Sequence, residues 1–180
     1  SDSPKQSKPT VLSSTIQETF LQFEFDGYHM IEAQTPNGVE YIINLEGGSS
    51  ILDAGAPDLD HFTTSIVIPD QGTTSIEVVS SSFRDYENVM VAPSKGNLSR
   101  SVIPSEVEYV YSDLYNQDSF YPGTLAELRA PYILRDLRGQ AVVIYPLQYN
   151  PQTNILRVYS DIEVKVTTVG TGGENVLYRS

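Results

Sequence analysis

The 180-residue sequence contains no cysteine and no tryptophan, and it has only 11 lysine and arginine residues against 23 aspartate and glutamate residues. Without cysteine the chain has no disulfide, no thiolate nucleophile and no cysteine-ligated metal. A net charge of -12 argues against the basic surface that nucleic-acid binding requires. No apolar run approaches the roughly 18 residues of a transmembrane helix. We therefore expect no nucleic-acid partner and no membrane insertion.

The length and the composition of the ends predict one domain with polar flanks. A chain of 180 residues buries about 70% of its unfolded surface on folding, so it needs no covalent staple. Residues 1–15 are polar and predicted to be flexible. Residues 16–168 form the predicted domain. Residues 169–180, which include Gly170, Gly172 and Gly173, are predicted to be a Gly-rich C-terminal linker.

Alternating hydrophobicity predicts an all-β fold. Over residues 155–166, five aliphatic side chains share one face of a strand and charged residues occupy the other, which is typical of a half-buried antiparallel strand. Residues 141–149 predict one preceding strand that is central in its sheet, and the Asn150-Pro151 turn joins the two as a hairpin. Further extended segments are expected at residues 19–25, 28–33, 41–43, 62–68 and 75–83, and one helical turn at residues 124–128. The pattern therefore predicts a two-sheet antiparallel β-sandwich.

The sequence contains no catalytic motif and predicts no cofactor. His29 and His61 lack any ligand or triad spacing, so we favour structural roles for both. Asp53, Asp58 and Asp60 do not match a calcium loop, and a solvated acidic turn is favoured over a calcium site, which stays the alternative. Tyrosines at 109, 111, 115 and 121 favour the edge of the core over an interface. We expect no catalytic residue and no metal.

One loop stands out against the acidic background. It carries Lys95 and Arg100, two of only 11 basic residues, between strands. Composition alone favours a solvated loop tip. Asn97, Leu98 and Ser99 also form a glycosylation sequon, a pattern that is frequent by chance.

Several segments around this loop resemble the N-terminal prodomain of the gingipain family, the caspase-fold cysteine peptidases of family C25. The segments are residues 92–96, 99–100, 109–111, 132–140, 146–151 and 156–159. The resemblance is strong from about residue 78 to 166, colinear from residue 19, and closest to the arginine-specific branch. A Leu-Pro expected after Pro57 is replaced by Leu59-Asp60.

The resemblance implies a β-sandwich prodomain that assists folding of its peptidase and keeps it latent. Arg100 corresponds to the arginine that enters the specificity pocket of the peptidase, and bonds after Arg100 and Arg179 are the candidate processing sites. The partner would be the cognate caspase-fold catalytic domain, in which the catalytic cysteine and histidine lie. The location would be exported: the periplasm in transit, then the outer-membrane surface or the medium. The implied inhibitory loop consists of Lys95, Gly96, Asn97, Leu98, Ser99, Arg100 and Ser101.

Two alternatives stay open at this point. A β-sandwich adhesion or interaction module of a surface protein would use the tyrosine-rich segment as its contact face. The prodomain-like N-terminal region of the C25-related secretion sortase would carry the loop without inhibiting anything.

Overall fold

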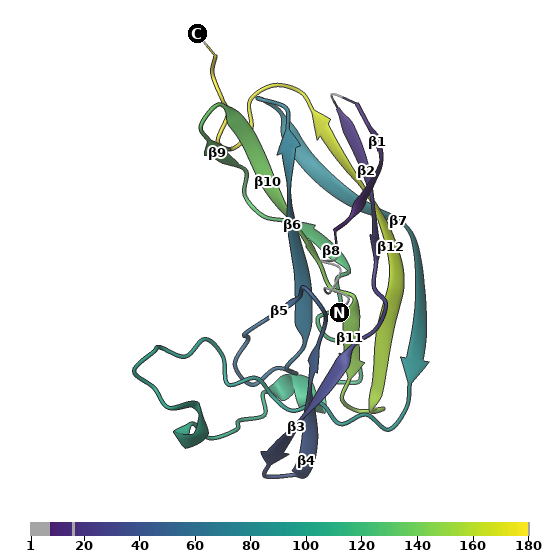
Figure 1. The fold of residues 1–180 in the computed structure, drawn as a ribbon, viewed down its shortest axis with the longest axis vertical. Coiled ribbons are helices and arrows are strands. Elements are labelled where there is room, and N and C mark those ends of the chain that lie inside the picture. Colours follow the sequence, from purple (N-terminus) through teal and green to yellow (C-terminus); the bar gives the residue numbers. More distant parts are fainter. Residues whose placement is uncertain (1–7, 16, 180) are drawn as a thin grey trace, which may run out of the picture.

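Two antiparallel sheets face each other across one hydrophobic core in the computed structural model, which describes residues 8–15 and 17–179 (Figure 1). The first sheet contains β1 (Thr10–Ser14), β2 (Glu18–Glu24), β12 (Ile155–Val169) and β11 (Leu147–Asn150) in that order, and β7 (Thr73–Tyr86) also pairs with β12. The second contains β5 (Ser49–Ser50), β6 (Asp60–Ile68), β10 (Leu137–Ile144) and β8 (Ala126–Leu128), and β9 (Tyr132–Leu134) also pairs with β10. β3 (His29–Thr35) and β4 (Gly38–Asn44) form a separate hairpin. The predicted β-sandwich is confirmed.

Strand β12 organises the first sheet because it pairs with β2 and β11 along one edge and with β7 along the other. Its inward side chains include Leu156, Ile162 and Val164, each 0% exposed, as the alternation predicted. Across the core, Phe23 of β2 meets Phe62 of β6 edge to face, with ring centroids 5.9 Å apart. Aromatic pairs in this geometry stabilise a core beyond the area they bury. The two sheets are therefore fixed face to face.

The predicted hairpin is present between β11 and β12, but the strand that precedes it is shorter than expected. Residues 141–149 do not form one strand: β10 ends at Ile144 in the second sheet, and β11 begins at Leu147 in the first. The chain changes sheet at Tyr145-Pro146. Proline has no N–H to donate to a sheet ladder. Here the Pro146 carbonyl instead accepts a hydrogen bond from the Tyr159 N–H, at 2.8 Å.

Two further expectations differ from the structure. Residues 124–128 are not helical: Ala126–Leu128 pair with β10, because tertiary pairing overrides the weak local preference of so short a segment. The helical turns are instead two 3-10 segments, η1 (Pro104–Glu106) and η2 (Asp113–Asn116). Regular structure also begins before residue 16, since β1 already pairs with β2. Residues 1–7 and Ile16 lie outside the described residues.

The C-terminal segment predicted as a linker is bonded to the domain. The Gly72 N–H donates to the Gly172 carbonyl at 2.7 Å, and the Leu177 N–H donates to the Asp70 carbonyl at 2.9 Å. Both partners belong to the turn between β6 and β7. Residues 172–177 therefore follow a defined path over one end of the sandwich.

Truncating the side chain of Val164, which is fully buried on β12, should destabilise the whole domain. Val164→Ala should lower the free energy of unfolding by about 1 to 3 kcal/mol through lost burial and a residual cavity. Urea denaturation measures this. Glu163→Ala, on the outward face of the same strand, is the matched control and should change stability by less than about 0.5 kcal/mol. Equal effects from the two substitutions would contradict the assignment of faces.

Candidate functional site

Residues 95–111, within the long connection between β7 and η2, project away from both sheets at one end of the molecule (Figure 1). The two stems of this loop are held by a single peptide segment. The Gly55 N–H donates to the Ser94 carbonyl at 2.9 Å, and the Gly55 carbonyl accepts from the Ser112 N–H at 2.9 Å. The Ser94 N–H in turn donates to the Ala56 carbonyl at 2.7 Å. Both ends of the loop are therefore held by the connection between β5 and β6, which contains Gly55.

Glycine is required at the centre of this clamp. Gly55 has φ +84°, and a Cβ there would lie 3.1 Å from the Cβ of Ser112. A side chain would be strained in this backbone region and would push against the outgoing stem. The clamp thus depends on a residue that the sequence places in an otherwise unremarkable loop.

Two tyrosines anchor the outgoing stem to the body of the domain. The Tyr111 hydroxyl donates to Oε1 of Glu40 on β4, which also accepts a hydrogen bond from the Thr35 hydroxyl at 2.6 Å. The Tyr115 hydroxyl donates to the Val91 carbonyl at 2.8 Å, and its ring meets that of Tyr111 edge to face. Burial, followed by the bond to Glu40, raises the pKa of Tyr111, so its phenol stays a donor. The tyrosine-rich segment therefore lies at the edge of the core, as favoured.

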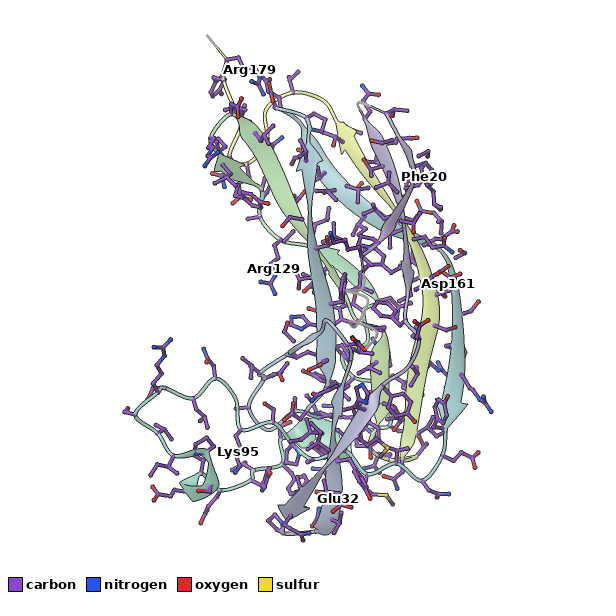
Figure 2. All side chains as sticks on the ribbon, in the orientation of Figure 1. Phe20, Glu32, Lys95, Arg129, Asp161 and Arg179 are labelled. Atoms are coloured by element: carbon purple, nitrogen blue, oxygen red, sulfur yellow. The ribbon has the colours of Figure 1, made fainter. Side chains whose placement is uncertain are left out.

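Inside the loop, Lys95 ties the two arms together. Its Nζ donates to the Pro104 carbonyl at 2.7 Å and lies 4.4 Å from the centre of the Tyr109 ring. Figure 2 shows Lys95 near the base of the loop, away from the tip. Gly96 has φ +80° and packs against Ala54. Lys95 and Gly96 therefore support the loop from within.

Arg100 occupies the tip. The Val102 N–H donates to the Ser99 carbonyl at 3.1 Å, which closes a turn around Arg100 and Ser101, and the Ser99 and Ser101 hydroxyls lie 2.9 Å apart. Asn97, Ser99, Arg100 and Ser101 are exposed, whereas Leu98 is half-buried. Within residues 8–15 and 17–179, Arg100 makes no hydrogen bond, ion pair or ring contact. Its guanidinium is free to meet an acidic group of another molecule.

Apolar side chains follow directly after this arginine. Val102 is 38% exposed and Ile103 is 55% exposed, and Val110 on the returning arm is 65% exposed. Solvated loop tips are normally polar. A charged tip flanked by exposed aliphatic residues is typical of a surface that becomes covered by a partner.

The three aspartates near Gly55 differ in their exposure. Asp60 is 4% exposed, and its Oδ2 accepts from the Leu45 N–H at 2.9 Å, so it is not part of a solvated turn as expected. Asp53 is exposed. Burial, and then the nearby charge of Asp60, raise the pKa of Asp58 to about 6. No group of three or more potential ligands that could hold a metal ion occurs in the described part of the chain.

The two histidines lie apart from the loop. His61 is buried, its Nδ1 lies 2.5 Å from the Ser49 carbonyl, and its ring stacks on Tyr145. His29 is exposed at the start of β3. The structure supports the structural role predicted for His61, and it does not bring His29 into any cluster.

The sequence located the loop and placed Tyr111 at the edge of the core, but it did not show what holds the loop. Gly55 and Glu40, which complete the attachment with Tyr111, are marked by no motif. One usable signal was Gly55 before Ala56-Pro57, because this composition is typical of a turn. The sequence therefore located the exposed loop. It could not locate the hydrogen bonds at the base of the loop, because these form between segments that are distant in the sequence.

The structure is thus an all-β domain that presents a loop carrying Arg100, with both stems of the loop bonded to Gly55. The chain belongs to the Propeptide_C25 family, whose sequence model matches residues 3–177. It is a non-catalytic prodomain of a cysteine peptidase. No helix in the part of the chain that the structure covers is long and apolar enough to cross a membrane.

Curated relatives agree with the family assignment. Gingipain R1 of Porphyromonas gingivalis is 41% identical over 168 residues, which cover 93% of this chain and 17% of that protein. Gingipain R2 of Porphyromonas gingivalis strain ATCC 33277 is 39% identical over 167 residues, which cover 93% of this chain and 23% of that protein. The chain thus spans less than a quarter of the length of these relatives.

Solved structures share the fold. The chain matches a structure described as a complex of Porphyromonas gingivalis RgpB pro- and mature domains, with a TM-score of 0.91 and 37% identity over 98% of this chain and 93% of that one. A structure addressing zymogenic latency of gingipain K from the same organism matches with a TM-score of 0.78 and 23% identity, over 94% of this chain and 96% of that one. At that identity the second match supports the fold alone.

Replacing Tyr111 should loosen the attachment of the loop. Tyr111→Phe leaves Glu40, only 7% exposed, with one donor fewer, and should lower the free energy of unfolding by about 1 to 3 kcal/mol. Hydrogen exchange should also accelerate at the Ser112 amide. Tyr109→Phe keeps the ring beneath Lys95 and removes a hydroxyl that has no hydrogen-bond partner in the described structure, so it should leave both measurements unchanged. Identical behaviour of the two variants would show that Glu40 does not anchor the loop.

The raised pKa of Asp58 predicts that its charge destabilises the fold at neutral pH. The folded carboxyl holds its proton up to about pH 6, whereas an unfolded aspartate titrates near pH 3.9, so folding takes up a proton between these values. The contribution of this group to stability therefore rises as pH falls from 7 to 4. Asp58→Asn should stabilise the domain by about 1 to 3 kcal/mol at pH 7.5 and by far less at pH 4. Thermal unfolding at both values tests this, with exposed Asp53→Asn as the control; a destabilising Asp58→Asn at pH 7.5 would refute it.

Proposed function

We propose that this chain is the inhibitory and folding-assisting prodomain of an exported, gingipain-like, arginine-specific cysteine endopeptidase. In this proposal Arg100 enters the specificity pocket of the peptidase and blocks its active site. The observation that carries the proposal is the guanidinium of Arg100, which has no partner among the described residues and lies at the tip of a loop whose two stems are both bonded to Gly55.

The chemistry of arginine suits this role. A guanidinium offers planar donors that match a carboxylate in a two-point contact, and an arginine-specific pocket requires such a carboxylate. Arg100 breaks no internal ion pair on docking, since it has none with the residues that the structure describes. The clamp at Gly55, the Tyr111–Glu40 bond and the Lys95 brace limit the freedom that the loop loses on binding.

The relatives indicate where the partner would come from. The RgpB structure contains pro- and mature domains in one complex. We propose that this chain likewise docks on the mature domain of its own peptidase, in which the catalytic cysteine and histidine would lie. Membership of the Propeptide_C25 family favours a prodomain over an adhesion module. The gingipain relatives favour the prodomain of a peptidase over the N-terminal region of a sortase.

The proposal includes export and processing. The prodomain would pass through the periplasm with its peptidase, which ends at the outer-membrane surface or in the medium. Cleavage after Arg100 would split the loop that presents the arginine, so a tight ligand becomes a released one. A cut after Arg179 would separate residues 1–179 from the chain that follows.

Removing the Arg100 side chain should weaken inhibition of the mature cognate peptidase by the domain added in trans. Arg100→Ala should cost roughly 2 to 5 kcal/mol of binding free energy, because the pocket carboxylate would be desolvated without a partner. Arg100→Lys should recover only part of the loss, since an ammonium cannot reproduce the two-point contact. Inhibition constants at fixed salt concentration measure these effects.

Two loop variants and a stability measurement serve as controls. Asn97→Ala removes an exposed side chain three residues from Arg100 and should have little effect. Lys95→Ala should cause a much smaller loss than Arg100→Ala, because Lys95 contacts Pro104 and Tyr109 inside the loop. Each variant must unfold at the wild-type temperature. Inhibition by a folded Arg100→Ala equal to that of the wild type would exclude the pocket role of this residue.

A further inference from the structure

The two candidate processing arginines, Arg100 and Arg179, differ in how they are bonded to the rest of the domain. Arg179 lies at the far end of the molecule from Lys95 and the loop (Figure 2). Arg100 is free at an exposed tip, whereas the backbone before Arg179 and the side chain of Arg179 are both bonded to the domain. The buried Arg138 holds the backbone before Arg179, and the half-buried Asp70 holds its side chain.

Arg138 fixes the backbone of the C-terminal segment. It lies on the inward side of β10 and is only 1% exposed. Its guanidinium donates to the Pro69 and Gly72 carbonyls at 3.1 Å, and to the Glu174 and Asn175 carbonyls at 2.6 and 3.0 Å. One side chain therefore joins the turn between β6 and β7 to the tail. A buried charge satisfied only by carbonyls is retained at a cost, and its donors are all used to hold this junction.

Asp70 fixes the side chain of Arg179. The two Asp70 carboxylate oxygens accept from Nε and Nη2 of Arg179 at 2.6 and 3.2 Å, and Nη2 also donates to the Asp136 carbonyl at 2.7 Å. The Asp70 carbonyl accepts from the Leu177 N–H. The same aspartate residue thus holds Arg179 through its carboxylate and Leu177 through its backbone.

The bond after Arg179 should resist an arginine-specific protease in this arrangement. An arginine-specific protease must take the arginine into its own pocket and the preceding residues in an accessible, extended path. Here the arginine side chain is already paired, and Leu177, Asn175 and Glu174 are engaged through their backbone. Cleavage therefore requires local opening of the segment, and its rate falls with the population of the open form.

We propose that Asp70 and Arg138 form a latch that masks the Arg179 processing bond in the folded prodomain. Asp70 and Arg138 are positioning residues that determine when this bond is accessible. The latch deepens the proposed function, since it makes the release of the prodomain from the following chain depend on opening of this end of the sandwich. It does not depend on whether Arg100 inhibits anything.

Limited proteolysis with trypsin tests the latch without the cognate peptidase. The substrate is the 180-residue chain with a fluorescent protein fused after Ser180, and mass spectrometry quantifies each cut. In the folded wild type the cut after Arg100 should precede the cut after Arg179. Asp70→Asn should accelerate the cut after Arg179 by about two- to fivefold, the range expected for loss of an exposed ion pair, and should leave the Arg100 cut unchanged. Arg138→Met should accelerate it by at least tenfold, because it removes the backbone contacts.

Asp136→Asn is the matched control, because it removes an equal charge near Arg179 but keeps the carbonyl that Arg179 contacts. It should not change the rate. The unfolding temperature is measured for every variant, and the Asp70→Asn comparison decides the test if Arg138→Met is unstable. Wild-type cleavage after Arg179 at least as fast as after Arg100, or equal acceleration by Asp70→Asn and Asp136→Asn, would overturn the latch. Because inhibition is not measured, failure of this test leaves the role of Arg100 a separate question.

Discussion

The backbone N–H and C=O of Gly55 are both hydrogen-bonded, one to the stem that enters the arginine loop and the other to the stem that leaves it. Closing a loop of this length costs conformational entropy, and the clamp covers part of that cost during folding rather than during binding. It can do so only because Ala56, Pro57 and their neighbours are themselves fixed against residues 92–94 and the core. The sandwich is therefore the support that makes the loop a presented element rather than a flexible one.

Three arginines show how one residue type can take three physical roles on an acidic domain. Arg138 is buried and satisfied by carbonyls, Arg179 is paired with Asp70 at the surface, and Arg100 has no partner within residues 8–15 and 17–179. With 23 acidic residues against 11 basic ones, an unpaired arginine at a projecting tip is unlike its surroundings. This availability, more than charge alone, is why we propose Arg100 as the ligand for a carboxylate outside the domain.

The sequence predicted those parts of the fold that repeat with a fixed period, and it failed where single contacts decide. The alternation over residues 155–166 located β12 and its inward face, since aliphatic and charged side chains separate cleanly there. The break at Pro146 was missed because the apolar run continues across it, although the missing N–H of proline was a usable signal. Arg138 was also missed. A basic residue on the inward side of a strand containing Val142 and Ile144 must find partners from distant segments, and only the folded chain identifies the tail as their source.

The proposed contact between Arg100 and a carboxylate in the arginine pocket of the mature peptidase can be measured as a coupling energy. A double-mutant cycle addresses it most directly, by combining Arg100→Ala in the prodomain with a neutral replacement of the acidic residue at the base of that pocket. Equilibrium binding measurements with the isolated domain, made for the four combinations of wild-type and variant partners, give the four binding free energies. The coupling energy should exceed about 1.5 kcal/mol, as close charge pairs across protein interfaces give. Additive effects of the two substitutions would show that Arg100 does not pair with that acidic residue.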